Sequence, residues 1–505
     1  MATVATDIHH NLGFTTGAIS PPRANTAPPL NVLRILRDTS LIVALLLINK
    51  GGTTGALIFF ATLAVMLFRS PKSAFQAMAI CYLGLMINQY FVPKTLVWTP
   101  ARLIMPFLAF IRFSVDLSSL KTVLISRSWY LAFLLFIATM AVGSTISGWF
   151  TQIALLKLFN FWAVTTAIMS GVLVLRSKRI DISEWFVSLI LAAACFGFGS
   201  LALGVSRNFR PIVTASGEII QSSGFNGAFL HPNLHATYAT LFVTYLLLVW
   251  ILGGYRKTWL TVPGIVSWFM FMAWSGSRTS IIASSIGAAI LVAYARPIVN
   301  RHGWLLKPTV KRGTLITLIV IVGAGVAAWD IATSGSISTS LIQFINKGDA
   351  EAAAEGLDTT QILSSRKALI ELSWQNFQEN ALFGIGFGVA KTEAFVRTAT
   401  LMTAPAEKGF LPTAILEEGG LMGASTFVLF LFMFIQQLVR ERNIAGLVTF
   451  VAFIATNIGE VTILSPGGAG SFGWMTVGAA MVLGDHCWTP PSAWSRSAWP
   501  ASQAT

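Results

Sequence analysis

The residues of this chain that could do chemistry are charged and polar side chains near the ends of long apolar segments. Arg278 lies in Trp274-Ser-Gly-Ser277-Arg278-Thr-Ser280, a short turn between two apolar runs. Ser277 can cap the following helix, which places Arg278 in a first turn whose free N–H groups favour an anion. The helix dipole disfavours a cation there, whereas the guanidinium fork suits a phosphate or diphosphate. The alternative is an arginine that snorkels to the lipid headgroups.

Two more arginines, Arg207 and Arg210, lie together in a second polar connection between apolar segments. We expect one of them to bind the substrate and the other to be a solvated loop charge. Arg102 and Lys157 lie about a turn inside their own apolar segments. For these two, snorkelling is at least as good an explanation as a role in a site.

His231-Pro232-Asn233-Leu-His235 opens another apolar segment. Proline in the first turn and a polar residue before it are ordinary helix-start signals, and they explain half of this motif without any function. His231 and His235 are four residues apart and could share a metal, but the sequence offers no third ligand. We therefore favour a histidine that donates a hydrogen bond or shuttles a proton, and expect no metal and no cofactor.

Glu417-Glu418-Gly419-Gly420 comes directly before an apolar run. Two acids at a helix start stabilise its dipole, and Glu418 could equally serve as a general base on a hydroxyl group. Glu460, at the end of the next run, has the same two interpretations. Since an acid is less favourable at a helix C-terminus, its presence there is the more informative.

These residues belong to a chain whose composition fits a membrane protein. Of the 505 residues, 54% are hydrophobic and only 11% are charged, against about 25% charged in soluble domains. A cytosolic enzyme, a secreted disulfide scaffold and a nucleic-acid binder are excluded on these grounds. The three cysteines have no metal-ligand or disulfide spacing. We attribute the net charge of +14 to membrane orientation.

Long apolar runs recur from about residue 33 to 485 and predict an all-α, polytopic bundle of 12 to 14 membrane-spanning helices. The first two runs are separated by Lys50-Gly51-Gly52, which is either a turn or a defect in one long helix. The predicted spans are 33–49, 53–69, 74–91, 97–113, 129–146, 152–175, 184–204, 233–253, 259–275, 278–295, 314–331, 420–438, 444–461 and 470–485.

The distribution of basic residues predicts the orientation of these spans. If the N-terminus is cytoplasmic, 21 of the 34 lysines and arginines lie inside and five lie in short outer loops. Positive charge accumulates in cytoplasmic loops, so we expect both termini in the cytoplasm. The predicted organisation is a tail at 1–32, a bundle at 33–331, a large outer loop at 332–419, further spans at 420–485 and a tail at 486–505.

The loop at 332–419 holds ten acidic residues and six basic ones, and a loop of this length is usually functional. It contains a helix signal: Ser364 and Ser365 can cap a run with apolar residues on one side. The run ends at Asn380-Ala-Leu-Phe-Gly384-Ile-Gly386-Phe-Gly388, whose glycines permit tight turns. We expect a short amphipathic helix at the outer mouth of the bundle.

From about 200 to 480 the chain resembles the O-antigen ligase and polymerase family of bacterial polysaccharide assembly. The resemblance rests on the order of several short motifs together with the topology. The motifs are Gly224-Phe-Asn-Gly-Ala-Phe-Leu-His231-Pro232-Asn233, Ser275-Gly-Ser277-Arg278-Thr279, the glycine-rich stretch from Asn380 to Gly388, Leu416-Glu417-Glu418-Gly419-Gly420-Leu-Met-Gly423 and Asn457-Ile-Gly-Glu460.

The resemblance implies a metal-independent glycosyltransferase of the membrane C-type class at the periplasmic face of the bacterial inner membrane. Its donor would be a glycan on undecaprenyl diphosphate, bound by Arg278 and Arg210. Glu418 and His231 complete the expected catalytic set. The expected partners are the bilayer, a flippase and a chain-length regulator, and not nucleic acid. The expected substrate-binding residues are Arg207, Asn233, Ser277, Lys408 and Glu460.

One departure from the family bears on the reaction. Ligases of this family carry a catalytic histidine shortly before the motif that ends the loop, and here the stretch reads Glu407-Lys408-Gly-Phe-Leu-Pro-Thr413 without one. This favours a polymerase that joins lipid-linked repeat units, with Lys408 replacing part of the lost function or Glu418 acting alone. The alternatives are a ligase that transfers glycan to a lipid or protein, and a transporter or flippase of polysaccharide precursors.

Overall fold

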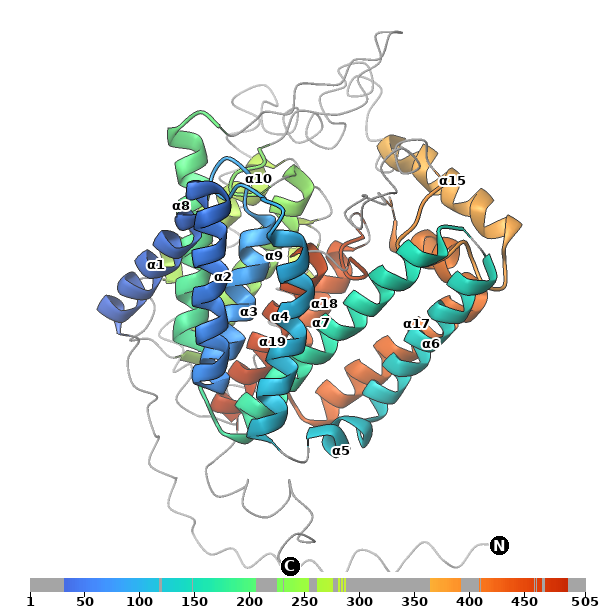
Figure 1. The fold of residues 1–505 in the computed structure, drawn as a ribbon, viewed down its shortest axis with the longest axis horizontal. Helices are drawn as coiled ribbons and strands as arrows, with labels where there is room; N and C mark the ends of the chain where they lie inside the picture. Colours follow the sequence, from blue (N-terminus) through green and yellow to red (C-terminus); the bar gives the residue numbers. More distant parts are fainter. Residues whose placement is uncertain are drawn as a thin grey trace, which may run out of the picture.

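The computed structural model describes fifteen helical elements and the segments that join some of them (Figure 1). Within the described part of the chain there is no strand, only an isolated bridge between Ile87 and Phe229. Several predicted features lie outside it, among them the span at 314–331, both tails and most of the loop at 332–419. The described residues are 31–117, 120–147, 149–205, 225–229, 231–253, 261–275, parts of 280–287, 364–391, 408, 410–457, 459, 461–465 and 468–488.

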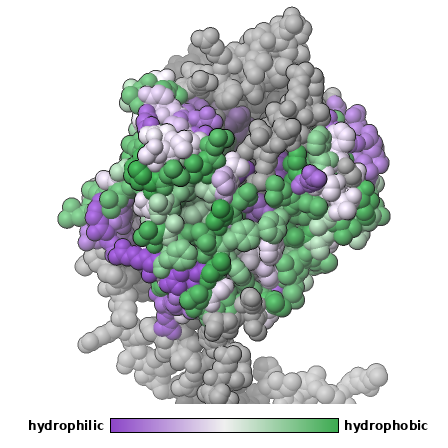
Figure 2. Space-filling model, in the orientation of Figure 1, coloured by the Kyte–Doolittle hydropathy of each residue, from purple (hydrophilic) through white to green (hydrophobic). Residues whose placement is uncertain are grey.

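The all-α, multi-pass architecture predicted from the sequence is confirmed. Among the described residues, five helical stretches are long and apolar enough to cross a membrane, one of them formed by α1 and α2 together. On the face shown in Figure 2, hydrophobic side chains cover much of the described surface of the bundle. Among the exposed ones are Phe107 on α4 and Phe432 on α17. A surface of this kind needs lipid around it.

The first two helices are separate elements. α1 (Val32–Leu47) is followed by a 3-10 turn, η1 (Ile48–Gly51), and α2 (Gly52–Arg69). Gly52 has φ +66° and ψ −138°, a conformation that favours glycine and ends the first helix. α1 then packs on α8, whereas α2 packs on α3 and α4. The Lys50-Gly51-Gly52 signal is therefore a turn between two helices.

The core of the bundle is centred on α19 (Gly468–Trp488), which packs against α3, α7, α8, α9 and α18. Glycines on α19 allow this close packing, as small residues do between membrane helices. A Cβ at Gly478 would lie 2.6 Å from Val172, and one at Gly473 would lie 2.3 Å from Phe453. The surrounding helices are α3 (Pro71–Met86), α7 (Thr151–Ser177), α8 (Ser183–Ala202), α9 (Pro232–Gly253), α10 (Thr261–Trp274) and α18 (Ile444–Thr456).

A second group of helices flanks this core. α6 (Ser128–Ser147) packs along α17 (Leu411–Arg440), and α15 (Ser364–Glu379) crosses one end of α17 (Figure 1). The predicted amphipathic helix is thus present as α15. The two groups meet where α7 packs on α6; α4 (Trp98–Asp116) packs on α7, and the short α5 (Leu120–Ile125) packs on both α6 and α7.

One end of the bundle, here called the Glu441 end, is linked by ion pairs. Glu441 pairs with Arg127 at 2.6 Å and with Arg176 at 2.7 Å, and Asp116 pairs with Lys178 at 2.6 Å. The loops that meet here are the ones that the basic-residue count places together in the cytoplasm. The opposite end of α17, here called the Glu418 end, has a different arrangement.

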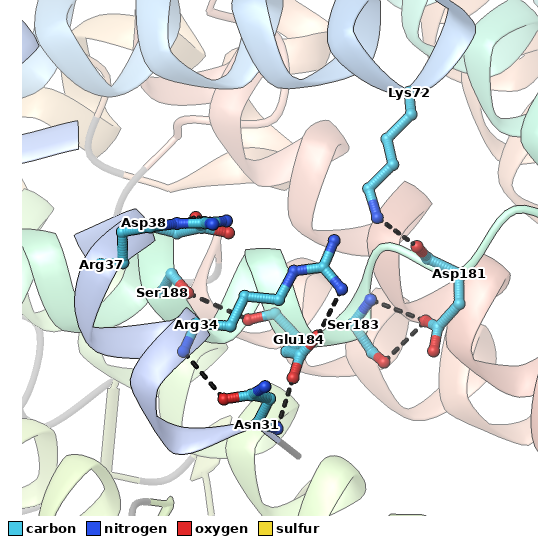
Figure 3. Close-up of polar contacts among 9 residues, drawn as sticks. All are labelled: Asn31, Arg34, Arg37, Asp38, Lys72, Asp181, Ser183, Glu184 and Ser188. Carbon is cyan, nitrogen blue, oxygen red and sulfur yellow. Dashed lines mark hydrogen bonds and ion pairs between the residues drawn. The ribbon is translucent and has the colours of Figure 1, made fainter. Parts of the chain in front are cut away.

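The beginning of α1 is held at the Glu441 end by contacts with α8 (Figure 3). The Glu184 carboxylate accepts a hydrogen bond from the backbone N–H of Asn31 at 2.6 Å and pairs with Arg34 at 3.4 Å. Lys72, at the start of α3, donates to the backbone oxygen of Asp181 at 2.9 Å. These contacts place the N-terminal ends of α1, α3 and α8 side by side.

Candidate active site at the break in α17

The Glu418 end of α17 is built around a break in the helix. α17 begins at Leu411, nine residues before the predicted start at 420. Pro412 lies in its first turn, where proline fits a helix without losing a hydrogen bond. Gly419-Gly420 therefore interrupts a longer helix, because Gly420 has φ +59° and ψ −161°. Glu417 and Glu418 lie in a separate N-terminal piece of α17, not at its first residue.

A glycine-rich segment, residues 380–391 and here called the Gly384 loop, fills the break. Its backbone N–H groups at Ile385 and Gly386 donate to the carbonyl oxygens of Glu417 and Glu418 at 2.8 and 3.0 Å. Its carbonyl oxygens at Ala381 and Leu382 accept from the two residues that follow Gly420, at 2.8 and 3.1 Å. The loop thus replaces the helical hydrogen bonds that the break removes.

Both glycines at this junction are sterically required. A Cβ on Gly420 would lie 2.4 Å from the backbone carbon of Leu382. Gly384 has φ +68°, and its Cβ would lie 2.5 Å from the backbone oxygen of Glu417. A glycine pair can let a substrate approach the backbone closely, but here the Gly384 loop occupies that position around Gly420. The glycines bring two protein segments together.

Glu417 is buried and fully engaged. Its carboxylate pairs with Lys408 at 2.6 Å and accepts hydrogen bonds from Ser373 at 2.7 Å and Asn376 at 2.8 Å. Ser373 and Asn376 are three residues apart on α15 and face α17 together. Only 2% of the Glu417 side chain and 4% of the Lys408 side chain are exposed. Glu417 therefore ties α15 to α17, which is a structural role.

Glu418 is equally buried but is not fully engaged. Only 4% of its surface is exposed, and it interacts with the backbone N–H of Gly388. Its Oε2 atom has no hydrogen-bond partner among the residues that the structure describes. A buried carboxylate oxygen normally has a partner, since an unsatisfied acceptor costs about 1–3 kcal/mol. Oε2 is thus a buried acceptor left open within the described part of the chain.

Lys157 completes this site from α7. It is 4% exposed, and its ammonium group donates to the backbone oxygen of Gly388 at 2.7 Å. It also lies within electrostatic range of Glu418 and Lys408. Of the two interpretations considered for Lys157, snorkelling does not fit a buried ammonium, and contact with the candidate site does. The four buried charges of Glu417, Glu418, Lys408 and Lys157 sum to zero.

The site lies at the edge of the lipid-facing surface. From Gly420 to Arg440, α17 has 21 residues, about 31 Å of helix, which is enough to cross the hydrocarbon core alone. Its exposed apolar side chains begin at Leu421 and continue to Val439. Glu417 and Glu418 precede this surface and are enclosed by α15 and the Gly384 loop.

The predicted histidine motif enters the structure on other helices. The Nδ1 atom of His231 accepts from the backbone N–H of Asn233 at 3.2 Å, which caps α9. His235 is fully buried among Phe225, Phe229, Trp268 and Phe271. Within the described ranges no three His, Cys, Asp or Glu residues could hold a metal ion. α9 packs on α10, α18 and α19, a different group of helices from that around Glu418.

Of the nine predicted site residues, the structure brings Glu418 and Lys408 together and places His231 and Asn233 at the start of α9. The others lie outside the described residues. Sequence reasoning missed Ser373, Asn376 and the contact of Lys157 with the site. The i, i+3 spacing of Ser373 and Asn376 on a predicted helix was the available signal for the first two. The residues outside the described ranges are Arg207, Arg210, Ser277, Arg278 and Glu460.

The chain was also compared with known proteins. No model of a protein family matches it, and no curated protein matches it either. The structure by itself therefore establishes a multi-pass membrane helix bundle with a buried, charge-balanced cluster at the Glu418 end.

Proposed function

We propose that this protein is a membrane glycosyltransferase that polymerises lipid-linked oligosaccharide repeat units, with undecaprenyl diphosphate as the lipid carrier, at the periplasmic face of the bacterial inner membrane. The observation that carries the proposal is the open Oε2 atom of Glu418, buried at the edge of the lipid-facing surface. The order of motifs that resembles the O-antigen ligase and polymerase family supports the same reaction. The missing histidine before Glu417 favours polymerisation over transfer to another acceptor.

In the proposed reaction, Glu418 accepts the proton of the attacking sugar hydroxyl as that oxygen bonds to the anomeric carbon of the donor glycan. The bond from this carbon to the diphosphate oxygen breaks, and the diphosphate leaves with the electron pair. A carboxylate within hydrogen-bond reach of the hydroxyl contributes about 10²–10⁴-fold to such a step. The sequence assigns Arg278 and Arg210 to the leaving diphosphate.

A transporter of polysaccharide precursors is the second candidate, and one observation favours it. Broken helices with buried charges are typical of transporters, and α17 is broken beside Glu417 and Glu418. Transporter sites lie near the middle of the bilayer, however. Here the 21 residues after the break span the membrane alone, so that the break falls at its edge and favours an enzyme.

A strain that lacks the protein separates these candidates. We expect it to accumulate a single repeat unit on the lipid carrier and no long polymer. Finished polymer that remains on the lipid would instead identify a ligase. Lipid-linked material that stays on the cytoplasmic leaflet would identify a transporter.

The role of Glu418 can be tested in the same strain by complementation. Glu418→Gln keeps size and hydrogen bonding but cannot accept a proton, so we expect about 10²-fold less polymer or lower still. The level of the protein in the membrane should be normal. Normal polymer made by Glu418→Gln at that level would remove Glu418 from the mechanism.

A further inference from the structure

A second group of polar atoms at the Glu418 end has no hydrogen-bond partners within the described part of the chain and does not belong to the cluster around Glu418. Arg102 lies in the second turn of α4, where the helix dipole opposes a cation. Its Nε atom is buried and has no hydrogen-bond partner among the described residues. The same holds for the hydroxyl of Tyr82, which is 1% exposed. Tyr82 lies within electrostatic range of Arg102.

The surroundings of Arg102 contain no compensating acid. The described helices that pack on α4 are α2, α3, α5 and α7, and none of them contains an aspartate or a glutamate. The single acid of α4 itself is Asp116, its last residue, which pairs with Arg112 at 2.7 Å and Lys178 at 2.6 Å. A guanidinium near the membrane core is expensive without a partner.

The nearest charges make this excess of positive charge larger. Lys157, on α7, lies within electrostatic range of Arg102. Lys94, in the loop before α4, lies over the Trp98 ring at 4.5 Å from its centroid and donates to the backbone oxygen of Gly84. Burial lowers the pKa of Lys94 to about 7, so Lys94 gives up charge more readily than an exposed lysine. Arg102 keeps its charge at any physiological pH.

The backbone of α4 is also altered at this position. Pro106 lies inside the helix and has no N–H to donate to the carbonyl oxygen of Arg102, four residues earlier. Proline at such a position bends a helix and frees that carbonyl. An arginine, a buried tyrosine hydroxyl and a helix-interior proline thus occur together, with Lys157 within electrostatic range of the arginine.

From this arrangement we propose that Arg102, with Tyr82 and Lys157, forms a binding site for a phosphate or diphosphate group between α4 and α7. The guanidinium fork offers two parallel N–H donors to such a group, and the Tyr82 hydroxyl offers a third. Lys157 lies within electrostatic range of both Arg102 and Glu418, so that the site adjoins the candidate active site. That this anion belongs to the lipid-linked substrate, whose diphosphate we also expect Arg278 and Arg210 to contact, rests on the proposed function, whereas the anion site itself does not.

Binding measurements on the purified full-length protein test this site directly. The first probe is inorganic pyrophosphate with protein in a neutral detergent. The second is phosphatidylglycerol in phosphatidylcholine nanodiscs, which reports an ordinary lipid headgroup. We expect Arg102→Ala to weaken binding of at least one probe by about tenfold or more, since such a loss corresponds to one charge-assisted contact. The probe that is affected identifies the source of the anion.

Two variants control this experiment. Arg102→Lys keeps the charge without the planar fork, so we expect a smaller loss than for alanine and normal folding. Lys50→Ala removes an exposed cation at the same end of the bundle, one that lies 4.2 Å from the Tyr90 ring centroid, and should leave binding unchanged. Wild-type affinity of Arg102→Ala for both probes would overturn the site. The two proposals can also fail separately. If Arg102→Ala loses binding but the deletion strain still makes normal polymer, the anion site is supported and the proposed function is refuted.

Discussion

The two ends of α17 hold carboxylates in opposite ways. At the Glu441 end, one carboxylate pairs with Arg127 and Arg176 and accepts a hydrogen bond from Gln437. At the Glu418 end, two adjacent carboxylates divide the roles. Glu417 binds Lys408, Ser373 and Asn376, and Glu418 keeps one buried oxygen open.

The difference shows where this protein fixes structure and where it leaves capacity for a ligand. Glu441 is satisfied twice over, and its side chain is 18% exposed, so its contacts can hold loops together at modest cost. Glu418 lies within a neutral set of charges, yet no hydrogen bond offsets the desolvation of its open oxygen. A substrate hydroxyl would remove that cost, which is the physical reason for placing function at this end.

The largest difference between the ends should appear when one buried cation is removed. Lys408→Met leaves Glu417 charged and without its ion pair, so we expect a loss of about 3–5 kcal/mol in the free energy of unfolding. Arg127→Met at the Glu441 end should cost about 0–1 kcal/mol, since the Arg127 side chain is 33% exposed. Chemical unfolding in mixed micelles measures both values. Adding Glu417→Gln to Lys408→Met should recover most of the loss, and equal losses at the two ends would contradict the comparison.

The break in α17 sharpens the comparison at the level of the backbone. Gly420→Ala places a Cβ where φ is +59° and where the backbone of Leu382 is 2.4 Å away. The strained conformation alone should cost about 1–3 kcal/mol. Gly51→Ala is the matched control, because its φ is −70° and no atom lies within 4 Å of its Cβ position.

We expect the thermal unfolding temperature to fall for Gly420→Ala and to stay close to wild type for Gly51→Ala. Hydrogen exchange should rise within the Gly384 loop of Gly420→Ala, because that loop is bonded across the break. Unchanged stability of Gly420→Ala would mean that the loop does not pack at Gly420.

The smallest expected effect is the pH dependence at the Glu441 end. Burial alone would raise the pKa of Glu441, but Arg176 and Arg127 outweigh it and hold the pKa below its ordinary value. A carboxyl whose pKa is lower in the folded state stabilises the fold above its unfolded pKa. This stabilisation is lost as the pH falls through the folded pKa.

Glu441→Gln should therefore lower the free energy of unfolding on the order of 1 kcal/mol at pH 7. The gap from wild type should close as the pH is lowered through the titration range of Glu441. Thermal unfolding of both proteins over a series of pH values measures it. A gap that is constant or widens toward acid would show that the two arginines do not hold the charged form.

Several parts of the fold could be predicted from local patterns. Apolar runs such as 129–146 and 152–175 correspond to α6 and α7 within a few residues, because a membrane span requires a set length of apolar helix. The serine pair and the glycines that bound α15 likewise placed that helix correctly. The distribution of basic residues predicted that the loops around Glu441 lie on the same side of the membrane. The ion pairs between these loops agree with that prediction.

The candidate site was only half visible in the sequence. The sequence indicated Glu418 as a carboxylate near a membrane edge, but it gave Glu417 and Glu418 the same helix-start environment. The two carboxylates have different environments because α15 hydrogen-bonds to Glu417, whereas the Gly384 loop and α7 reach Glu418. A glycine pair also looks the same in the sequence whether it begins a helix or interrupts one.

The sequence by itself thus determined the membrane class, most helices and the grouping of loops, since apolar length, capping and charge are local properties of the chain. Only the tertiary structure decided which carboxylate is engaged and which is open, and that Lys157 contacts the Gly384 loop. The physical reason is that a buried charge is defined by its partners. Here several partners come from segments more than 40 residues away along the chain, such as Ser373 for Glu417 and Gly388 for Lys157.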